Sequence, residues 1–315
     1  MPVQRDDQSL VGLFLRGLCM GAADVVPGVS GGTMAFILGI YERLIESIKS
    51  MGRPPFWRAL LGGNLLGAYE AIGGHFLLAI GAGILVAVLS LARLLSWLLR
   101  HHPVPVWSFF LGLVLASVVV VSRRIERWSA GLVTALMAGT LGAFAIVGFL
   151  PAQTPEAPWF LFLSGAMAIC AMILPGVSGS FILVLLGKYQ FILDALNQRD
   201  IETLVYFVTG IAIGIVSFAQ FLSWLFRRYH DLTIALMTGL MLGSLRKVWP
   251  WKLDLLTRVN SHGEIVPLVQ QNVLPAAFGG DVWAALALAA LGFGVVFALE
   301  MVARRTATVS PGAAS

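Results

Sequence analysis

The sequence predicts an all-α integral membrane protein with two inverted-topology repeats of five helical segments each. Three observations predict this fold. The 315 residues are 58% hydrophobic and only 12% charged, whereas soluble domains have about 25% charged residues. The apolar residues form long continuous runs rather than the alternating pattern of β-barrel strands. The motif PGVSG interrupts such runs twice, once in each half of the chain.

Ten apolar segments follow one another along the chain: 10–24, 31–45, 74–99, 105–121, 129–150, 158–174, 179–193, 203–226, 232–247 and 282–303. The third, fifth, eighth and tenth can span a membrane, because about 20 residues cross the hydrocarbon core. The fourth and ninth are slightly short. The remaining four cover only about 22 Å each and are joined in pairs by PGVSG. We therefore expect two re-entrant hairpins of half-helices, 10–45 with its tip at 24–33 and 158–193 with its tip at 174–180.

The repeat rests on two collinear blocks of similarity. PGVSG at 27–31 recurs at 175–179, and LSWLLR at 95–100 corresponds to LSWLFR at 222–227. The change of spacing between the blocks means that the first half carries about 21 extra residues, within 53–73. Each half, 10–150 and 158–303, has five segments. Because five is odd, the second half would enter the membrane from the opposite face.

Basic residues at the ends of the segments predict the orientation. With the N-terminus inside, twelve lie in inner loops: Arg5, Arg43, Lys49, Arg53, Arg58, Arg123, Arg124, Arg127, Arg227, Arg228, Arg304 and Arg305. Seven lie outside: Arg100, Lys188, Arg199, Arg246, Lys247, Lys252 and Arg258. This excess favours N-in and C-in, with 248–281 as an outer extramembrane loop. The net charge of +5 comes from these segment ends, so no nucleic-acid partner is expected.

The two breaks are the candidate functional site. Proline ends a helix, glycine allows close approach to a ligand, and serine or threonine suits the start of the next helix. A half-helix N-terminus has free N–H groups and a partial positive charge, so it suits an anion. Two such tips would meet near the midplane, as in transporters; a kink that serves packing alone is the alternative. The candidate substrate-binding residues are Pro27, Gly28, Val29, Ser30, Gly31, Gly32, Thr33, Pro175, Gly176, Val177, Ser178, Gly179 and Ser180.

Four polar residues lie within apolar segments. Asp24, at intramembrane depth, could carry a proton, coordinate Na⁺ or pair with Arg16, or it could simply be solvated in a wet cavity. The equivalent position in the second half is Met172, so a coupling-ion site would be asymmetric. Arg16, Arg93 and its aligned residue Gln220 are further candidates for substrate binding, although either arginine could instead snorkel to the membrane surface.

Neither the cysteines nor the histidines indicate a metal or another cofactor. Cys19 and Cys170 both lie in apolar segments, where small side chains pack well. The five histidines lie at segment ends or in loops and lack metal-ligand spacing.

The stretches GLCMGAADVVPGVSGGTMAFILGIYERLI (17–45) and AMILPGVSGSFILVLLGKY (171–189) closely resemble bacterial undecaprenyl-phosphate translocases, the PopT family, formerly a membrane domain of unknown function. The resemblance covers about 10–303 and implies a transporter in the cytoplasmic membrane. Its substrate would be undecaprenyl phosphate, returned from the outer leaflet to the inner one for peptidoglycan and other envelope polymers. The residues alone indicate only an anion, with possible H⁺ or Na⁺ coupling.

Two other functions compete with this interpretation. The first is transport of a small soluble anion. The second is an intramembrane polyprenyl-pyrophosphate phosphatase, which would need several acidic residues near a metal. Asp24 is the only carboxylate deep within an apolar segment, which argues against the phosphatase.

Overall fold

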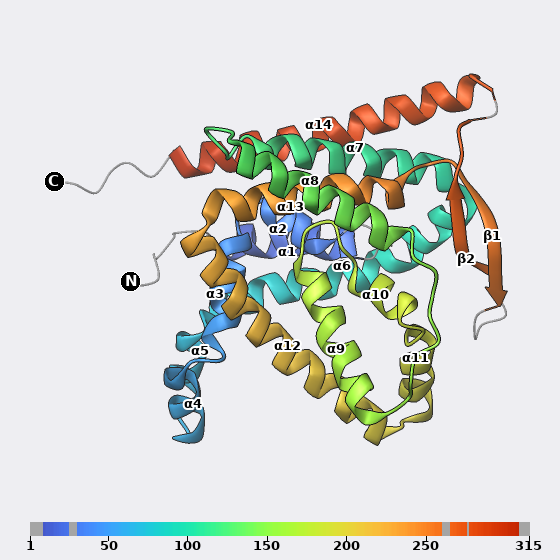
Figure 1. The fold of residues 1–315 in the computed structure, drawn as a ribbon. Coiled ribbons are helices and arrows are strands. Elements are labelled where there is room, and N and C mark those ends of the chain that lie inside the picture. Colours follow the sequence, from blue (N-terminus) through green and yellow to red (C-terminus); the bar gives the residue numbers. More distant parts are fainter. Residues whose placement is uncertain (1–8, 25–29, 260–264, 276, 309–315) are drawn as a thin grey trace.

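The computed structural model describes residues 9–24, 30–259, 265–275 and 277–308. Over these ranges the chain forms a helical bundle and one β-hairpin (Figure 1). The elements are α1 Leu10–Asp24, α2 Gly31–Ile37, α3 Tyr41–Ser50, α4 Pro54–Leu61, α5 Leu65–Ala71, α6 Gly74–His101, α7 Pro103–Ser122, α8 Ala130–Val147, α9 Pro158–Ile173, α10 Gly179–Leu185, α11 Tyr189–Gln198, α12 Ile201–Arg228, α13 His230–Val248, β1 Lys252–Val259, β2 Ile265–Asn272 and α14 Gly280–Thr308.

Five of the described helices, α6, α7, α8, α12 and α14, are long and apolar enough to cross a membrane. The short helices α10 and α11 meet at a bend of 101° and add a sixth span if they are counted together. α13 is also 19 residues long, but it begins with His230 and Asp231 and ends with Arg246 and Lys247. The chain is therefore a multi-pass helical membrane protein, as the sequence predicts.

Four pairs of helices pack through reciprocal glycines. In each pair, a Cβ added to either glycine would collide with the backbone of the partner helix. Such close approach of backbones is typical of helix packing in membranes. The glycines are Gly17 and Gly83 in α1–α6, Gly165 and Gly210 in α9–α12, Gly112 and Gly292 in α7–α14, and Gly139 and Gly239 in α8–α13.

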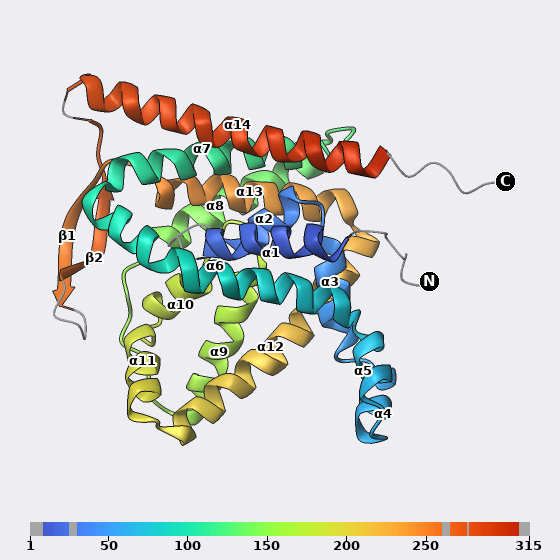
Figure 2. The same ribbon diagram turned by 180° about the vertical axis from the view of Figure 1, so that it is seen from behind.

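The two halves use equivalent pairs. α1 packs along α6 as α9 packs along α12, whereas the last helix of each half packs along a helix of the other half: α8 along α13, and α14 along α7. Figures 1 and 2 show these exchanged pairs side by side. The exchange ties the halves into one bundle.

The structure divides each expected second half-helix in two. The segment 31–45 breaks into α2 and α3 at Gly39, and 179–193 breaks into α10 and α11 at Gly187. Both glycines have left-handed backbone angles, with φ of 70° and 64°, which end a helix and which glycine adopts without strain. α2 and α10 are therefore only seven residues long.

The polar region 248–281, expected as a loop, contains the antiparallel hairpin β1–β2. The all-α prediction thus holds for the bundle and is wrong for this region. The hairpin caps the end of α13: Asn272 Nδ2 donates to the carbonyl of Arg246 at 2.7 Å, and Lys252 Nζ donates to that of Lys247 at 2.7 Å. These bonds satisfy carbonyls that a helix end leaves without partners.

The bundle has two distinct ends. The start of α1, the end of α14 and helices α3 to α5 lie at one end, which we call the terminal end (Figures 1 and 2). The β-hairpin and α11 lie at the other, which we call the hairpin end.

Candidate functional site: the meeting of two broken helices

The first break joins α1 to α2, and two side chains accept hydrogen bonds from the first backbone N–H groups of α2. Ser30 is the N-cap residue, and its Oγ accepts the N–H of Gly32 at 3.1 Å. Asp24 Oδ1 accepts the N–H of Gly31 at 2.6 Å. These side chains satisfy donors that a helix start otherwise leaves free. Pro27, Gly28 and Val29 lie outside the described residues.

Two glycines of this break are required by close contacts. A Cβ on Gly31 would overlap the carboxylate of Asp24. A Cβ on Gly32 would lie 2.6 Å from the carbonyl oxygen of Ile173, the last residue of α9. The glycines therefore let α2 approach both the end of α1 and the end of α9.

The second break, between α9 and α10, differs from the first in its capping. Ser178 is the N-cap residue but makes no side-chain capping bond; its Oγ lies 2.9 Å from the Oγ of Ser180. Gly176 has a φ of 82°, and Pro175 is buried. Because Met172 stands where the first half has Asp24, this position supplies no carboxylate to α10.

The two breaks contact each other directly. Ser30 Oγ donates to the carbonyl of Met172 at 3.2 Å, and Tyr41 Oη donates to that of Ile173 at 3.1 Å. Thr33 Oγ1 accepts the N–H of Gly176 at 3.0 Å. Side chains of the first half thus satisfy backbone groups freed where α9 ends, which membrane burial requires. This meeting of the breaks is the geometry expected from the sequence.

The other three candidates are spread along long helices. Arg16 is half-buried on α1, about two turns before Asp24. Gln220 is exposed on α12, and its amide lies beside Gly52 at the end of α3, towards the terminal end. Arg93 belongs to α6, and its side chain lies outside the described part.

A charged network that the sequence does not reveal joins α3 to α12 at the terminal end. Glu46 is paired with Lys49 at 3.0 Å and with Arg53 at 2.5 Å, and Ser223 of α12 donates to Glu46 at 2.9 Å. Lys49 also donates to Ser223 at 2.9 Å. The only signal in the sequence is the spacing of Glu46 and Lys49, which suits an ion pair on one helix face.

The network keeps Glu46 charged. Burial raises the pKa of the Glu46 carboxyl, but hydrogen bonds from Lys49 and Ser223 and the charges of Lys49 and Arg53 outweigh burial. The pKa therefore lies below its ordinary value, so Glu46 is an anion at neutral pH.

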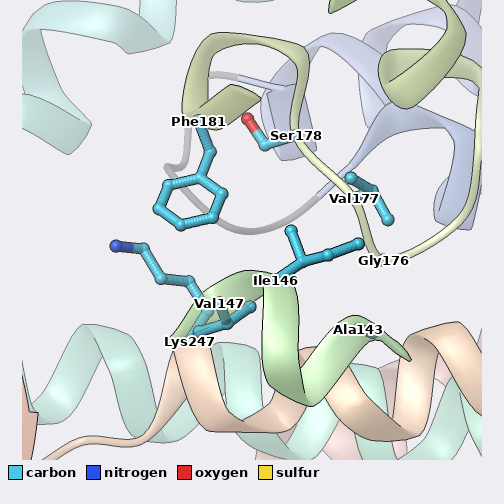
Figure 3. A pocket seen from close by; sticks show the side chains of 8 residues that line it. All are labelled: Ala143, Ile146, Val147, Gly176, Val177, Ser178, Phe181 and Lys247. Atoms are coloured by element: carbon cyan, nitrogen blue, oxygen red, sulfur yellow. The ribbon is translucent and has the colours of Figure 1, made fainter. Parts of the chain in front are cut away.

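A pocket lies beside the second break (Figure 3). Gly176, Val177 and Ser178 line one side of it, and the end of α8 and Lys247 of α13 line the other. Lys247 is the only charged residue among the lining residues. In the described part of the chain, no group of three or more His, Cys, Asp or Glu side chains could hold a metal ion.

Comparisons with known proteins identify a family. A family model described as VCA0040-like, undecaprenyl phosphate translocase-like, matches residues 20–266. A polyprenyl-phosphate transporter of Vibrio cholerae is 49% identical over 265 residues, covering 84% of this chain and 86% of the relative. A polyprenyl-phosphate transporter of Staphylococcus aureus is 30% identical over 256 residues, covering 75% and 85%. No solved structure matches.

Proposed function

Because the chain belongs to the undecaprenyl phosphate translocase-like family, we propose that it is a transporter that moves undecaprenyl phosphate across the bacterial cytoplasmic membrane. The names of both relatives support a polyprenyl phosphate as the substrate. The observation that carries the proposal is the contact between the breaks, Ser30 to Met172 and Thr33 to Gly176. A bundle that only anchors itself in lipid has no need of polar backbone inside it.

The two halves have inverted topology in this proposal, with both chain ends at the cytoplasmic face. The equivalent pairs α1–α6 and α9–α12, and the exchanged pairs α7–α14 and α8–α13, support the repeat. The excess of basic residues in the predicted inner loops supports the orientation. The terminal end is then cytoplasmic and the hairpin end is outside. Net movement from the outer leaflet to the inner one would return the lipid carrier to peptidoglycan synthesis.

An asymmetry between equivalent helices supports alternating access. At the terminal end α3 packs against α12 of the other half. The equivalent contact at the hairpin end would join α11 to α6. Among the described residues, α11 packs against α10 and α12 but makes at most marginal contact with α6. The structure thus resembles a state closed towards the cytoplasm, and rocking of the halves would exchange the two contacts.

Asp24 links the first break to the transport cycle. Its carboxylate holds the N–H of Gly31, so a phosphate could reach that donor only after the carboxylate leaves. Protonation of Asp24, or its capture of Na⁺, would weaken this bond. We therefore assign the coupling role to Asp24, with H⁺ or Na⁺ as the coupling ion.

Lipid movement in proteoliposomes tests the function. Fluorescent undecaprenyl phosphate is incorporated, and its accessibility to an impermeant quencher is followed with and without protein. Protein-dependent movement is expected, at least tenfold slower in the double variant Ser30→Ala, Ser178→Ala. Ser129→Ala is the matched control, because Ser129 caps α8 away from the breaks. No movement above empty liposomes under any pH or Na⁺ gradient would refute the proposal.

A further inference from the structure

Lys247 is a half-buried cation. It lies at the end of α13 in the pocket beside the second break, and its Nζ lies 4.7 Å from the centre of the Phe181 ring (Figure 3). The walls around it are apolar, formed by Ile146 and Val147 of α8 together with Phe181. In the described part of the chain, no carboxylate forms an ion pair with Lys247.

The charged neighbours of Lys247 increase this imbalance. Lys252, from the β-hairpin, donates to the carbonyl of Lys247 and so brings a second basic group close. Arg246 is directed to the carbonyl and ring of Phe144. Asp254 is an acid that acts on Lys252, and it accepts a hydrogen bond from Gln270 at 2.7 Å. A half-buried cation in apolar surroundings is unfavourable unless an anion joins it.

We propose that the Lys247 pocket is the docking site of the substrate, with the phosphate monoester paired to the Lys247 ammonium and the first prenyl unit against Ile146, Val147 and Phe181. This inference rests on the proposed function and specifies where the head group first binds. The pocket lies at the hairpin end, which is the outer side in the proposed orientation. A lipid taken from the outer leaflet would meet it before it meets the breaks.

The surroundings of the pocket suit a lipid better than a soluble anion. α8, which forms one wall, exposes Met137, Leu141 and Phe144 on its outer face. Phe149 and Leu150, directly after α8, are 62% and 66% exposed. In a membrane this surface faces lipid, so a prenyl tail could remain in the bilayer while its head group reaches Lys247.

Phe181 lies in the same pocket as Lys247 and Ser178. In Figure 3 its ring lies between the ammonium of Lys247 and the hydroxyl of Ser178, and that hydroxyl is bonded to Ser180. A head group paired with Lys247 would therefore lie beside the Phe181 ring, in the same pocket as Ser178.

Binding to the purified full-length protein in detergent tests the proposal. The probes are farnesyl phosphate, farnesol and inorganic phosphate. Lys247→Met keeps an unbranched side chain that is one atom shorter and removes its charge, and Lys247→Arg restores a cation. Arg246→Met is the matched control, because it removes the neighbouring positive charge, which is directed to Phe144. We expect Lys247→Met to weaken farnesyl phosphate binding at least tenfold, and the other two variants to stay within threefold of the wild type.

Four outcomes would overturn the inference. Equal binding of farnesyl phosphate by the wild type and Lys247→Met would show that Lys247 does not bind the phosphate. A loss of farnesyl phosphate affinity in Arg246→Met as large as that in Lys247→Met would show a general effect of positive charge rather than a specific site. Inorganic phosphate that binds as tightly as farnesyl phosphate, or farnesol binding that also falls in Lys247→Met, would contradict a site for the head group of a lipid.

Lipid movement separates failure of this inference from failure of the proposed function. If wild-type protein moves undecaprenyl phosphate and Lys247→Met moves it equally well at limiting lipid, the docking site is refuted and the transporter stands. If farnesyl phosphate binds through Lys247 but wild-type protein moves no lipid, the phosphate site is supported and the transport function is refuted.

Discussion

The charged network around Glu46 should hold the terminal end closed. Glu46→Gln keeps the shape of the side chain and removes its charge. The hydrogen bond that Ser223 of α12 donates to Glu46 at 2.9 Å would then lose its charged acceptor, whereas the ion pair of Glu46 with Lys49 lies within α3. Hydrogen bonds to charged groups contribute about 1.5–3 kcal/mol.

The ion pairs of Glu46 with the two arginines contribute less to stability. The side chains of Arg53 and Arg227 are 47% and 60% exposed, and exposed pairs contribute about 0–1 kcal/mol each. We therefore expect Glu46→Gln to destabilise the contact between α3 and α12 by about 2 kcal/mol, which changes the ratio of closed to open protein about 30-fold. Ser223→Ala removes the hydrogen bonds from α12 to both Glu46 and Lys49, so it should act in the same direction with an effect at least as large.

A disulfide reports the population of the closed state. A Cβ on Gly52 would lie 2.5 Å from Val216 Cγ1 of α12, so the pair Gly52→Cys, Val216→Cys is close enough for a disulfide. In a background with Cys19 and Cys170 replaced by serine, we expect rapid cross-linking. Lipid movement should stop on oxidation and return on reduction.

Glu46→Gln in this background should slow cross-linking by about the 30-fold change estimated above. Arg58→Gln is the charge control, because Arg58 lies on α4 outside the network. Cross-linking of Glu46→Gln at the unchanged rate would refute the role of the network. Undiminished lipid movement by the cross-linked protein would refute the exchange of contacts between α3–α12 and α6–α11.

Three further predictions concern a coupling ion, a titrating lysine and a helix contact. Asp24→Asn keeps an acceptor for the N–H of Gly31, so we expect folded protein whose lipid movement no longer responds to pH or Na⁺ gradients; an unchanged response would remove Asp24 from coupling. Burial and then the charge of Lys247 lower the pKa of Lys252 to about 7, although Asp254 raises it. The unfolded amine keeps its ordinary pKa and binds more protons above pH 7, so stability should rise by up to about 2 kcal/mol between about pH 7 and 8.5. In unfolding measurements at different pH, Lys252→Met should lack this rise. If the stability of the variant rises with pH as steeply as that of the wild type, the lowered pKa of Lys252 is contradicted. Gly239→Ala should cost about 1–3 kcal/mol because its Cβ would overlap the carbonyl of Leu136; Gly142→Ala, which enters open space, should not lower the melting temperature.

The helical bundle and the meeting of the breaks could be predicted because both depend on local patterns. Long apolar runs predict the spans, and the matched PGVSG motifs predict two equivalent interruptions. The ends of α2 and α10 were also within reach, because Gly39 and Gly187 are separated by the same 148 positions as the two PGVSG motifs. Their left-handed φ angles of 70° and 64° give each glycine its role as a helix end.

The contacts of individual polar residues could not be predicted in the same way. Glu46 and Lys49 share a helix, but Ser223 lies 177 positions from Glu46 along the chain, and only the packing of α3 against α12 brings them together. Lys247 resembles an ordinary anchor at a helix end. Its isolation from carboxylates depends on α8, α10 and the β-hairpin, which meet only in the folded chain.

The difference between the two breaks has a consequence for transport. A ligand shifts a conformational equilibrium only if it binds the two states differently. Two identical breaks in inverted halves would offer a phosphate the same environment from either side. Here the first break holds its own carboxylate, Asp24, against Gly31, whereas the second has Met172 in that position and Lys247 nearby. In the proposed cycle, an arriving phosphate would therefore be attracted at the second break and repelled by Asp24 at the first until that carboxylate is neutralised. This asymmetry would give the cycle a preferred break for entry and a defined step at which a coupling ion could act.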